Sequence, residues 1–261
     1  SRSSRLVAGQ VGLMSERIHE RFDRVAEGYA AYRPSCPPEL IRKIASLCRN
    51  HEQVWEPGCG SGQVTPFLAS AFDSVLATDP APAAIAQAPA IKGVRFEVGD
   101  ASRCSLGDGK ADLIAVAQAS HWFNMSVFVE EARRVAAPDA VVALWCYDRP
   151  RVSTEVDAVI DHLYFDVLKG CWDAGREHID TRYTDLSFPF KALDVEVPDY
   201  QASWTVDGML GYLRTWSAVD VVAERGDGDA IAVIESDLKR AWGSETRTVC
   251  WPVGIRAGRT W

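Results

Sequence analysis

The sequence predicts an α/β fold with a doubly wound, mostly parallel sheet, and three observations support this prediction. Strand-like and helix-like segments alternate from residue 53 to residue 146. Two of the strand-like runs, 113–117 and 141–145, are continuously apolar, as expected of strands that helices cover on both faces. A glycine-rich turn from Gly58 to Gly62 joins the first strand to a helix, at the edge where a doubly wound sheet places its ligand.

The elements of the first half follow from hydrophobic periodicity and from the positions of proline. Residues 16–31 are expected to form an amphipathic helix, and a second helix is expected over 39–49 after a proline-rich break. The expected strands are 53–56, 74–78, 93–98, 111–117 and 140–146, with helices over 62–71, 81–88 and 124–136 between them. Strands separated by helices pair in parallel through right-handed crossovers, so helices should cover both faces of the sheet.

The pattern changes after Pro150. The expected elements are a helix over 153–169, an aromatic-rich irregular segment over 170–190, a strand near 192–203, helices near 206–218 and 228–242, and a last strand near 247–256. We therefore divide the chain into N-terminal helices over 14–50, a core over 51–150, and a region over 151–261 that adds two strands and a helical cap. Residues 1–13 are interpreted as a leader foreign to the native chain, which would start at Met14.

Composition argues against several classes of protein. The net charge of −8 disfavours non-specific binding to nucleic acid or to an anionic membrane, since phosphate binding requires a basic face. No run approaches the ~20 apolar residues of a membrane span. The seven cysteines are scattered and the five histidines are dispersed, which favours reduced thiols in the cytoplasm over disulfides or a zinc site.

The glycine turn carries the most specific motif in the chain. Its sequence from residue 56 to residue 62 is E-P-G-C-G-S-G, so glycines stand at the alternate positions 58, 60 and 62. Glycine lets bare backbone approach a ligand because it has no Cβ atom. A dinucleotide-binding G-x-G-x-x-G motif would require a glycine where the chain has Gln63. The spacing therefore disfavours a nicotinamide-dependent oxidoreductase.

Three acidic residues, Glu56, Asp79 and Asp100, end or follow the first three strands. Carboxylates at this edge of a parallel sheet can accept hydrogen bonds from ribose hydroxyls or pair with a cation. Each residue also has a simpler interpretation. Glu56 could be a solvated strand end, Asp79 a helix N-cap before Pro80, and Asp100 a turn residue.

The glycine turn and the three acids together resemble the cofactor motifs of class I S-adenosylmethionine (SAM)-dependent methyltransferases. This resemblance implies a Rossmann-like sheet of seven strands, the last of them antiparallel, with SAM as cofactor and S-adenosylhomocysteine as product. It implies that Glu56 faces the methionine amino group, Asp79 the ribose and Asp100 the adenine amino group. The cofactor residues expected from it in this part of the chain are Glu56, Gly58, Cys59, Gly60, Gly62, Asp79, Pro80, Asp100, Ala101 and Gln118.

Further stretches are similar to the branch of this family that holds trans-aconitate methyltransferase. They are F-x-x-x-A-x-x-Y-x-x-x-R-P over 22–34, Q-A-S-H-W-F over 118–123 and W-P-V-x-x-R-x-G-R over 251–259. Cys36 departs from the pattern, because the branch usually carries an aromatic residue near the second proline. The resemblance implies that Tyr29 and Arg33 close over the methionine end of the cofactor, where Arg33 would bind the carboxylate. Alternatively, Arg33 caps the C-terminus of the preceding helix.

The methyl acceptor is expected just past the fourth strand, where His121 and Trp122 are candidate substrate residues. His121 is also the candidate general base, although a single histidine is usually structural. Trp145, at the end of the fifth strand, is a candidate wall of an apolar pocket or else part of the core. An ionised carboxylate acceptor needs no base, whereas a phenol or a ring N–H would benefit from one.

The predicted function is therefore SAM-dependent methylation of a small molecule, with an oxygen acceptor favoured over the nitrogen of a heterocycle. A non-catalytic SAM-binding module is the alternative, because the motif residues hold the cofactor and perform no chemistry. The acidic charge and the Q-A-S-H sequence after the fourth strand, in place of an N-P-P-Y-type motif, argue against a nucleic-acid acceptor. We expect a cytoplasmic monomer or homodimer that takes a small-molecule substrate and binds no metal, nucleic acid or membrane.

Overall fold

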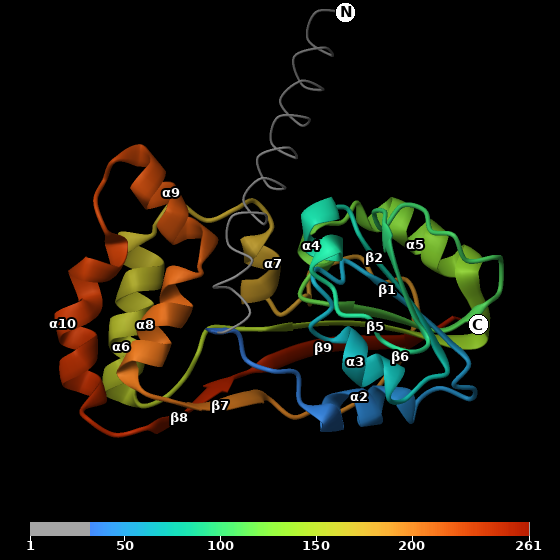
Figure 1. Ribbon diagram of the computed structural model, residues 1–261, viewed down its shortest axis with the longest axis horizontal. Helices are drawn as coiled ribbons and strands as arrows, with labels where there is room; N and C mark the ends of the chain where they lie inside the picture. Colours follow the sequence, from blue (N-terminus) through green and yellow to red (C-terminus); the bar gives the residue numbers. More distant parts are fainter. Residues whose placement is uncertain (1–31, 261) are drawn as a thin grey trace, which may run out of the picture.

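The central feature of the fold is a seven-stranded sheet with the strand order β3-β2-β1-β4-β5-β9-β6 (Figure 1). The computed structural model describes residues 32–260. The strands are β1 Gln53–Pro57, β2 Ser74–Asp79, β3 Val94–Val98, β4 Ala111–Ala117, β5 Ala136–Tyr147, β6 Lys191–Leu193 and β9 Val253–Arg259. Strands β1 to β5 pair in parallel, and β9 runs antiparallel to both β5 and β6. The predicted seven-stranded, mostly parallel sheet with an antiparallel last strand is confirmed.

Helices and apolar side chains cover both faces of the sheet, because successive residues of a strand point to opposite sides. One apolar layer includes helices α2 (Pro38–Ala45) and α3 (Thr65–Ala69), and the other includes α5 (Met125–Val135). In β1, Val54 belongs to the first layer and Trp55 to the second, and both are fully buried. This two-sided burial explains why the central strands are continuously apolar in sequence.

The helices of the first half are shorter than the sequence analysis expects. The helix expected over 62–71 is α3, which begins at Thr65 because the glycine turn extends past Gly62. The helix expected over 81–88 is α4 (Pro82–Ala86). The helix expected over 16–31 lies outside the described residues.

The helices of the C-terminal half gather at one end of the sheet and form the cap (Figure 1). They are α6 Thr154–His162, which continues as a π-helical turn over Leu163–Val167, α7 Arg176–Asp180, α8 Val206–Arg214, α9 Ser217–Arg225 and α10 Ala230–Trp242. Helix α10 packs against α6, α8 and α9. The short helix α7 lies between these four helices and the sheet (Figure 1). A two-stranded antiparallel ribbon of β7 (Tyr200–Trp204) and β8 (Arg247–Trp251) runs along the base of the cap.

The structure divides several elements that the sequence analysis treats as single. The strand expected near 192–203 is β6 followed by β7, which belong to different sheets, and the strand expected near 247–256 is β8 followed by β9. Pro252 separates β8 from β9, because proline has no N–H to donate to a ladder. The helix expected near 206–218 is α8 followed by α9, and the irregular segment over 170–190 contains the short helix α7.

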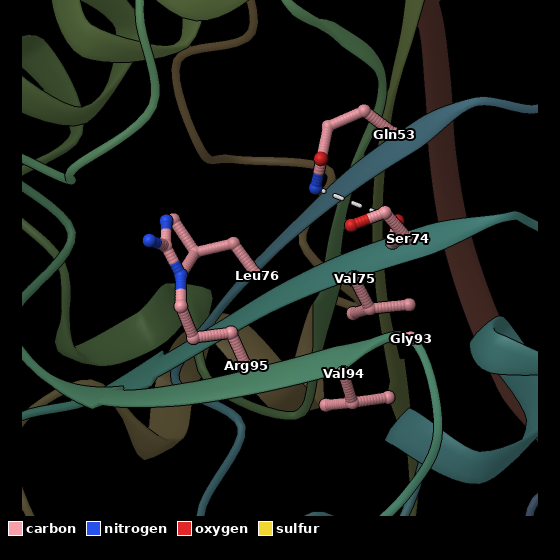
Figure 2. Close-up of a pocket in the computed structure, with 7 residues that line it drawn as sticks. All are labelled: Gln53, Ser74, Val75, Leu76, Gly93, Val94 and Arg95. Carbon is pink, nitrogen blue, oxygen red and sulfur yellow. Dashed lines mark hydrogen bonds between the residues drawn. The ribbon is translucent and has the colours of Figure 1, made fainter.

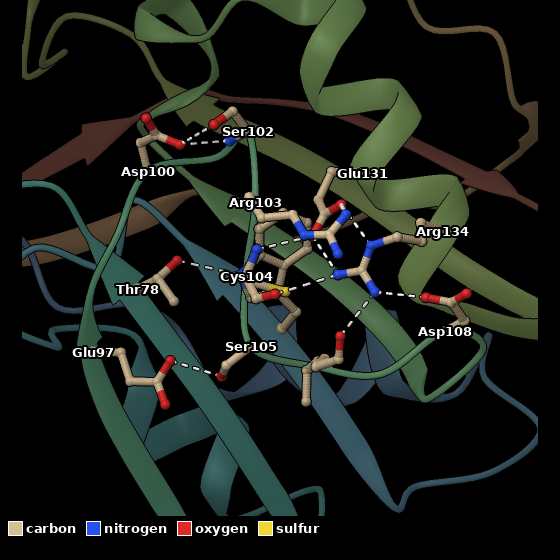
Figure 3. A network of polar contacts seen from close by, with 12 residues as sticks. Thr78, Glu97, Asp100, Ser102, Arg103, Cys104, Ser105, Asp108, Glu131 and Arg134 are labelled. Atoms are coloured by element: carbon tan, nitrogen blue, oxygen red, sulfur yellow. Dashed lines mark hydrogen bonds and ion pairs between the residues drawn. The ribbon is translucent and has the colours of Figure 1, made fainter.

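The connection from β3 to β4, residues 99–110, contains no helix, and a polar network holds it to α5 (Figure 3). Glu131 of α5 is 4% exposed and accepts a hydrogen bond of 2.8 Å from the backbone N–H of Cys104. Arg134 pairs with Glu131 and also with Asp108, at an N–O distance of 2.7 Å. Burial alone would raise the pKa of Glu131, but the hydrogen bonds and the charge of Arg134 lower it overall. The pair therefore fixes the segment that leaves the carboxyl end of β3.

An open hollow of ≈ 290 Å³ lies at the amino ends of β1, β2 and β3 (Figure 2). Its lining residues are Gln53, Ser74, Val75, Leu76, Gly93, Val94 and Arg95. The side chains of Leu76 and Arg95 point to the same side of the sheet. The glycine turn lies at the carboxyl ends of these strands, so the hollow is separate from the candidate site.

Three properties bear on the class of protein. Within residues 32–260, no group of three or more His, Cys, Asp or Glu side chains is arranged to hold a metal ion. All seven cysteines are free thiols. Over the same part of the chain, every helix is too short or too polar to cross a bilayer.

Replacing Arg134 should destabilise the protein strongly, because the buried charge of Glu131 would keep only the exposed Arg103, 3.9 Å away, as a cationic neighbour. We expect Arg134→Met to lower the free energy of unfolding at pH 7 by about 3–5 kcal/mol, measured by urea denaturation. The double variant Glu131→Gln/Arg134→Met is the control, and it should be more stable than the single variant because no buried charge remains. Since the pair lowers the Glu131 pKa, its contribution is present above pH ~4.3 and is lost at lower pH. A loss below ~1 kcal/mol, the range of exposed ion pairs, would contradict this account.

Candidate functional site

Backbone hydrogen bonds fix the glycine turn to the neighbouring strand. The N–H groups of Gly58 and Cys59 both donate to the Thr78 carbonyl of β2, at 2.7 and 3.1 Å. Gly58, Gly60 and Gly62 all have positive φ, which residues with a Cβ atom rarely adopt. A Cβ atom added at Gly60 would meet no protein atom within 4 Å. The turn therefore presents bare backbone at the carboxyl edge of the sheet.

Asp79, the last residue of β2, holds the glycine turn from the side. One carboxylate oxygen accepts a hydrogen bond of 2.8 Å from the Gly60 N–H, and the other accepts one of 2.9 Å from the Ala81 N–H. Helix α4 begins later, at Pro82, so the N-cap interpretation of Asp79 is wrong. Pro80 lies exposed beside the carboxylate. Each carboxylate oxygen has a second lone pair, which remains compatible with the predicted ribose contacts.

Glu56 is a buried carboxyl group at the end of β1, and the solvated interpretation of this residue is therefore wrong. Its side chain accepts a hydrogen bond of 2.6 Å from the Thr65 hydroxyl of α3. Burial raises the pKa of Glu56 to about 8, against the effect of that hydrogen bond, and the charge of Asp79 adds to the rise. The same burial, with the neighbouring acids, raises the pKa of the Cys59 thiol, so this thiol is neutral. A cationic ligand would stabilise such a buried carboxyl group more than a neutral ligand would.

Asp100 and Ala101 form a turn directly after β3. One oxygen of Asp100 accepts a hydrogen bond of 2.8 Å from the backbone N–H of Ser102 and another from the Ser102 hydroxyl (Figure 3). This geometry is the Asx turn that the simpler interpretation of Asp100 predicts. Asp100 is exposed and Ala101 is buried in the second apolar layer. Their contacts with adenine stay a prediction.

Gln118 uses its side chain on the backbone of the adjacent strand. Its carbonyl oxygen accepts a hydrogen bond of 2.9 Å from the Tyr147 N–H, and its amide donates one of 3.2 Å to the Tyr147 carbonyl. The backbone of Gln118 has φ +54°, a left-handed conformation that is uncommon for a residue with a side chain. The two bonds align the carboxyl ends of β4 and β5, and the contact of Gln118 with the cofactor stays a prediction.

Arg33 lies where the end of β5 meets the cap. Its Nη1 donates a hydrogen bond of 2.9 Å to the Tyr147 hydroxyl, and its guanidinium carbon lies 5.6 Å from the ring centre of Tyr212 in α8. Tyr29 and the helix that Arg33 could cap lie outside the described residues. The roles predicted for Tyr29 and Arg33 at the methionine end of the cofactor therefore stay predictions.

His121 lies just past β4, in the 3₁₀ turn Ser120–Trp122. Its Nδ1 is 2.9 Å from the Tyr183 hydroxyl. Burial, together with the positive charges of Arg176 and His178, lowers the pKa of His121 to about 3. The imidazole is therefore neutral and weakly basic at pH 7.

The two candidate tryptophans have different surroundings. Trp122 is 38% exposed, and its ring centre lies 4.8 Å from that of His121. Trp145 is fully buried, and its indole N–H donates a hydrogen bond of 3.1 Å to the Tyr200 hydroxyl. The structure thus places Trp145 in the core.

Three residues that sequence reasoning did not assign also belong to this edge: Thr65, Tyr147 and Arg176. Thr65 follows Gly62 by three positions at the start of a helix, and this position alone could have suggested a hydroxyl donor. Tyr147 ends β5 at the carboxyl edge, but its bonds with Gln118 and Arg33 depend on tertiary contacts. Arg176 is in the aromatic-rich irregular segment, where no local pattern indicates its position.

The residues at this edge fit SAM. Gly60 offers backbone with open space in front of it, and Asp79 has lone pairs beside this turn. Glu56 is a buried acid whose described hydrogen-bond partner, Thr65, is neutral. An ammonium group such as the amino group of SAM would restore the ionised state of Glu56 and compensate for its burial.

Comparison with known proteins agrees with this geometry. Residues 55–144 match the family model described as a methyltransferase domain. An uncharacterized methyltransferase of Mycobacterium tuberculosis is 31% identical over 215 residues, which cover 78% of this chain and 76% of that protein. A Dictyostelium discoideum protein assigned as a methyltransferase is 29% identical over 230 residues, 87% of this chain and 88% of that protein.

One solved structure resembles this chain over nearly its whole length. It is a protein from Anaeromyxobacter dehalogenans assigned as a type II methyltransferase, with 40% sequence identity and a TM-score of 0.81. The match covers 87% of this chain and 97% of that one. These comparisons do not single out the trans-aconitate branch, so the narrower resemblance stays a prediction. The chain belongs to the class I SAM-dependent methyltransferases, and SAM is its cofactor.

Proposed function

We propose that this enzyme methylates an oxygen atom of a small organic acceptor, and that this oxygen belongs to a carboxylate. Bound SAM supplies a methyl group on a sulfonium, which leaves as the neutral thioether of S-adenosylhomocysteine. The observation that carries the proposal is the state of His121, the one candidate base identified at the acceptor edge. Its pKa of about 3 makes it a poor acceptor of a proton at pH 7.

The proton balance of the acceptor supports a carboxylate. A phenol, with a pKa near 10, or a ring N–H must lose a proton as it is methylated, so either would benefit from a base. A carboxylic acid has a pKa near 4 and arrives ionised at pH 7. With a neutral His121, the site is therefore better suited to an acceptor that needs no deprotonation.

The chain's own residues would act by holding the acceptor in line. His121 and Trp122 follow β4, and Arg33 and Tyr147 lie at the end of β5, so the acceptor would sit between this edge and the cap. Orientation of this kind can account for ~7–11 kcal/mol of a reaction barrier. His121 would then donate or accept a hydrogen bond without taking up a proton. Trp145 would support the pocket indirectly, through its bond to Tyr200.

The expected surroundings of the enzyme also remain proposals. Seven free thiols are consistent with a reducing compartment such as the cytoplasm. The net charge of −8 supports a small-molecule acceptor over nucleic acid. We propose a monomer or a homodimer.

A panel of acceptors tests the proposed chemistry. We expect S-adenosylhomocysteine, measured by mass spectrometry, to form with small carboxylic acids, and the co-product to be a methyl ester that mild alkali hydrolyses. Phenols and nitrogen heterocycles of similar size are the comparison sets. Turnover confined to heterocycles, with an alkali-stable product, would replace the oxygen assignment by N-methylation.

Replacing Glu56 should abolish the release of a proton that accompanies SAM binding. Glu56 must lose its proton to pair with the amino group, so the affinity for SAM should rise by up to about tenfold per unit between about pH 6 and 7.5. Glu56→Gln should bind SAM more weakly and without this rise, as measured by calorimetry. The matched control ligand is 5′-methylthioadenosine, which lacks the amino-acid group and should show no rise with either protein. An equal pH dependence in both proteins would show that another group carries the proton.

His121 should prove dispensable as a base. With a carboxylate acceptor and saturating SAM, we expect the wild-type kcat/KM for the acceptor to have no acidic limb near pH 6.5, because the folded-state pKa of His121 lies far below that value. His121→Asn should lose less than about tenfold in kcat, well short of the ~10²–10⁴-fold contributed by general bases. A limb near pH 6.5 that disappears in this variant, with a loss above about 100-fold, would restore His121 as the base.

A further inference from the structure

Tyr183 is a fully buried tyrosine whose hydroxyl contacts the ring of His121. The Tyr183 oxygen lies 2.9 Å from Nδ1 of His121, and the two ring centres are 6.1 Å apart. Tyr183 follows α7 in the sequence, whereas His121 follows β4, so tertiary packing brings the two side chains together. A buried hydroxyl group requires a hydrogen-bond partner, and Nδ1 supplies it.

The backbone that carries Tyr183 has an uncommon conformation. Arg182 and Tyr183 have φ of +54° and +64°, left-handed values that residues with a Cβ atom seldom adopt. Arg256 of β9 donates a hydrogen bond of 3.2 Å to the Tyr183 carbonyl. A Cβ atom added at Gly254 of β9 would overlap the Arg182 side chain, so this glycine makes room for the turn. Residues in such conformations persist where their surroundings fix them, and they cluster at functional sites.

The same segment also contacts the backbone of His121. A Cβ atom added at Gly175, directly before α7, would lie 2.6 Å from the His121 carbonyl oxygen. The start of segment 175–183 therefore lies against the main chain of His121, and Tyr183 at its end contacts the ring. Because one segment holds both parts of His121, rotation of the imidazole is restricted.

The imidazole of His121 is neutral, so one of its two ring nitrogens carries the proton. Burial, with the positive charges of Arg176 and His178 in α7, lowers the pKa of His121 to about 3. The nitrogen that carries the proton is set by the hydrogen bond that the other nitrogen makes. For His121, the Tyr183 hydroxyl makes that bond at Nδ1.

Tyr183 is the donor of this hydrogen bond. Burial, with a smaller contribution from the Cys146 thiol, raises the pKa of Tyr183 well above its usual value, so the hydroxyl keeps its proton. The backbone N–H groups of Ser120 and His121 act against this rise because they face the Tyr183 oxygen. The buried Ser120 hydroxyl has no hydrogen-bond partner among the described residues, so Nδ1 is the acceptor for the Tyr183 O–H group. The proton of the imidazole is therefore on Nε2.

We infer that Tyr183 is a positioning residue that keeps the His121 proton on Nε2, so that this N–H group donates a hydrogen bond to the acceptor oxygen. The inference rests on the proposed carboxylate methylation, in which His121 donates a hydrogen bond and takes up no proton. Within residues 32–260, Nε2 has no hydrogen-bond partner and is therefore the ring nitrogen that a ligand can reach. A fixed N–H donor favours an acceptor oxygen that has lone pairs and no proton, as a carboxylate oxygen does.

NMR of the protein labelled with ¹⁵N-histidine tests the position of the proton without any acceptor. The His121 signals are identified by their loss in His121→Gln, and in the wild type we expect a protonated Nε2 and an unprotonated Nδ1. In Tyr183→Phe the bond to Nδ1 is lost, so the proton should exchange between the two nitrogens and their signals should move toward each other. The control Ser120→Ala removes a neighbouring hydroxyl that makes no hydrogen bond, and it should leave both signals in place. A proton on Nδ1 of the wild type, or unchanged signals in Tyr183→Phe, would overturn the inference.

Acceptor kinetics test the role of the N–H group. Tyr183→Phe should raise KM for a carboxylate acceptor by about 3- to 10-fold, the range for one neutral hydrogen bond, and should still bind SAM with the affinity of the wild type. The amide of His121→Gln can occupy the place of Nε2, whereas the amide of His121→Asn occupies the place of Nδ1. We therefore expect a lower KM for His121→Gln than for His121→Asn, and equal values would overturn the donor role. If Tyr183→Phe does not fold, the wild-type NMR signals and this pair of variants decide the inference.

The inference and the proposed function fail in different ways. Turnover of carboxylic acids with the same KM in wild type and Tyr183→Phe would overturn the role of Tyr183 and leave carboxylate methylation intact. Absence of turnover with every carboxylic acid would refute carboxylate methylation, and the donor role with it, even if the proton is found on Nε2.

Discussion

The candidate site depends on the hydrogen bonds that anchor the glycine turn to β2. The Thr78 carbonyl receives two backbone N–H groups of the turn, and the Asp79 carboxylate receives a third from Gly60. These bonds hold three glycines in left-handed conformations and keep bare backbone at the carboxyl edge of the sheet. Because β2 is paired along its length with β1 and β3, the glycine turn is anchored to the rigid part of the parallel sheet.

Two oppositely charged regions meet at this edge. The cofactor side carries Glu56, a buried acid whose burial is compensated when a cation binds. The proposed acceptor side carries Arg176, which lies against aromatic rings of the cap, and His121, which burial and nearby positive charge keep neutral. A cationic methyl donor and an anionic acceptor would therefore each lie beside groups of opposite charge.

Sequence predicted the sheet well because its signals are local. Alternating strands and helices, continuous apolar runs and a glycine turn all lie within short windows, and strand pairing then brings Glu56, Asp79 and Asp100 to one edge. The interpretation of other residues required tertiary contacts. Gln118 forms a hydrogen bond with a residue 29 positions away in the sequence, and His121 with one 62 positions away. Contacts between residues so far apart leave no local sequence pattern that could predict them. Trp145 lies in the core although its position at a strand end also suited a pocket wall. Strand breaks such as the one at Pro252 could have been predicted, because proline interrupts a ladder.

The central claim is that SAM binds across the carboxyl ends of β1 to β3, with its amino-acid end toward Glu56. A crystal structure of the protein soaked with S-adenosylhomocysteine tests this most directly. We predict that the ligand's amino group contacts the Glu56 carboxylate, that its ribose lies beside Asp79, and that its sulfur faces the space between His121 and Arg176. Density for the ligand at another edge of the sheet, or with its amino group remote from Glu56, would contradict the account.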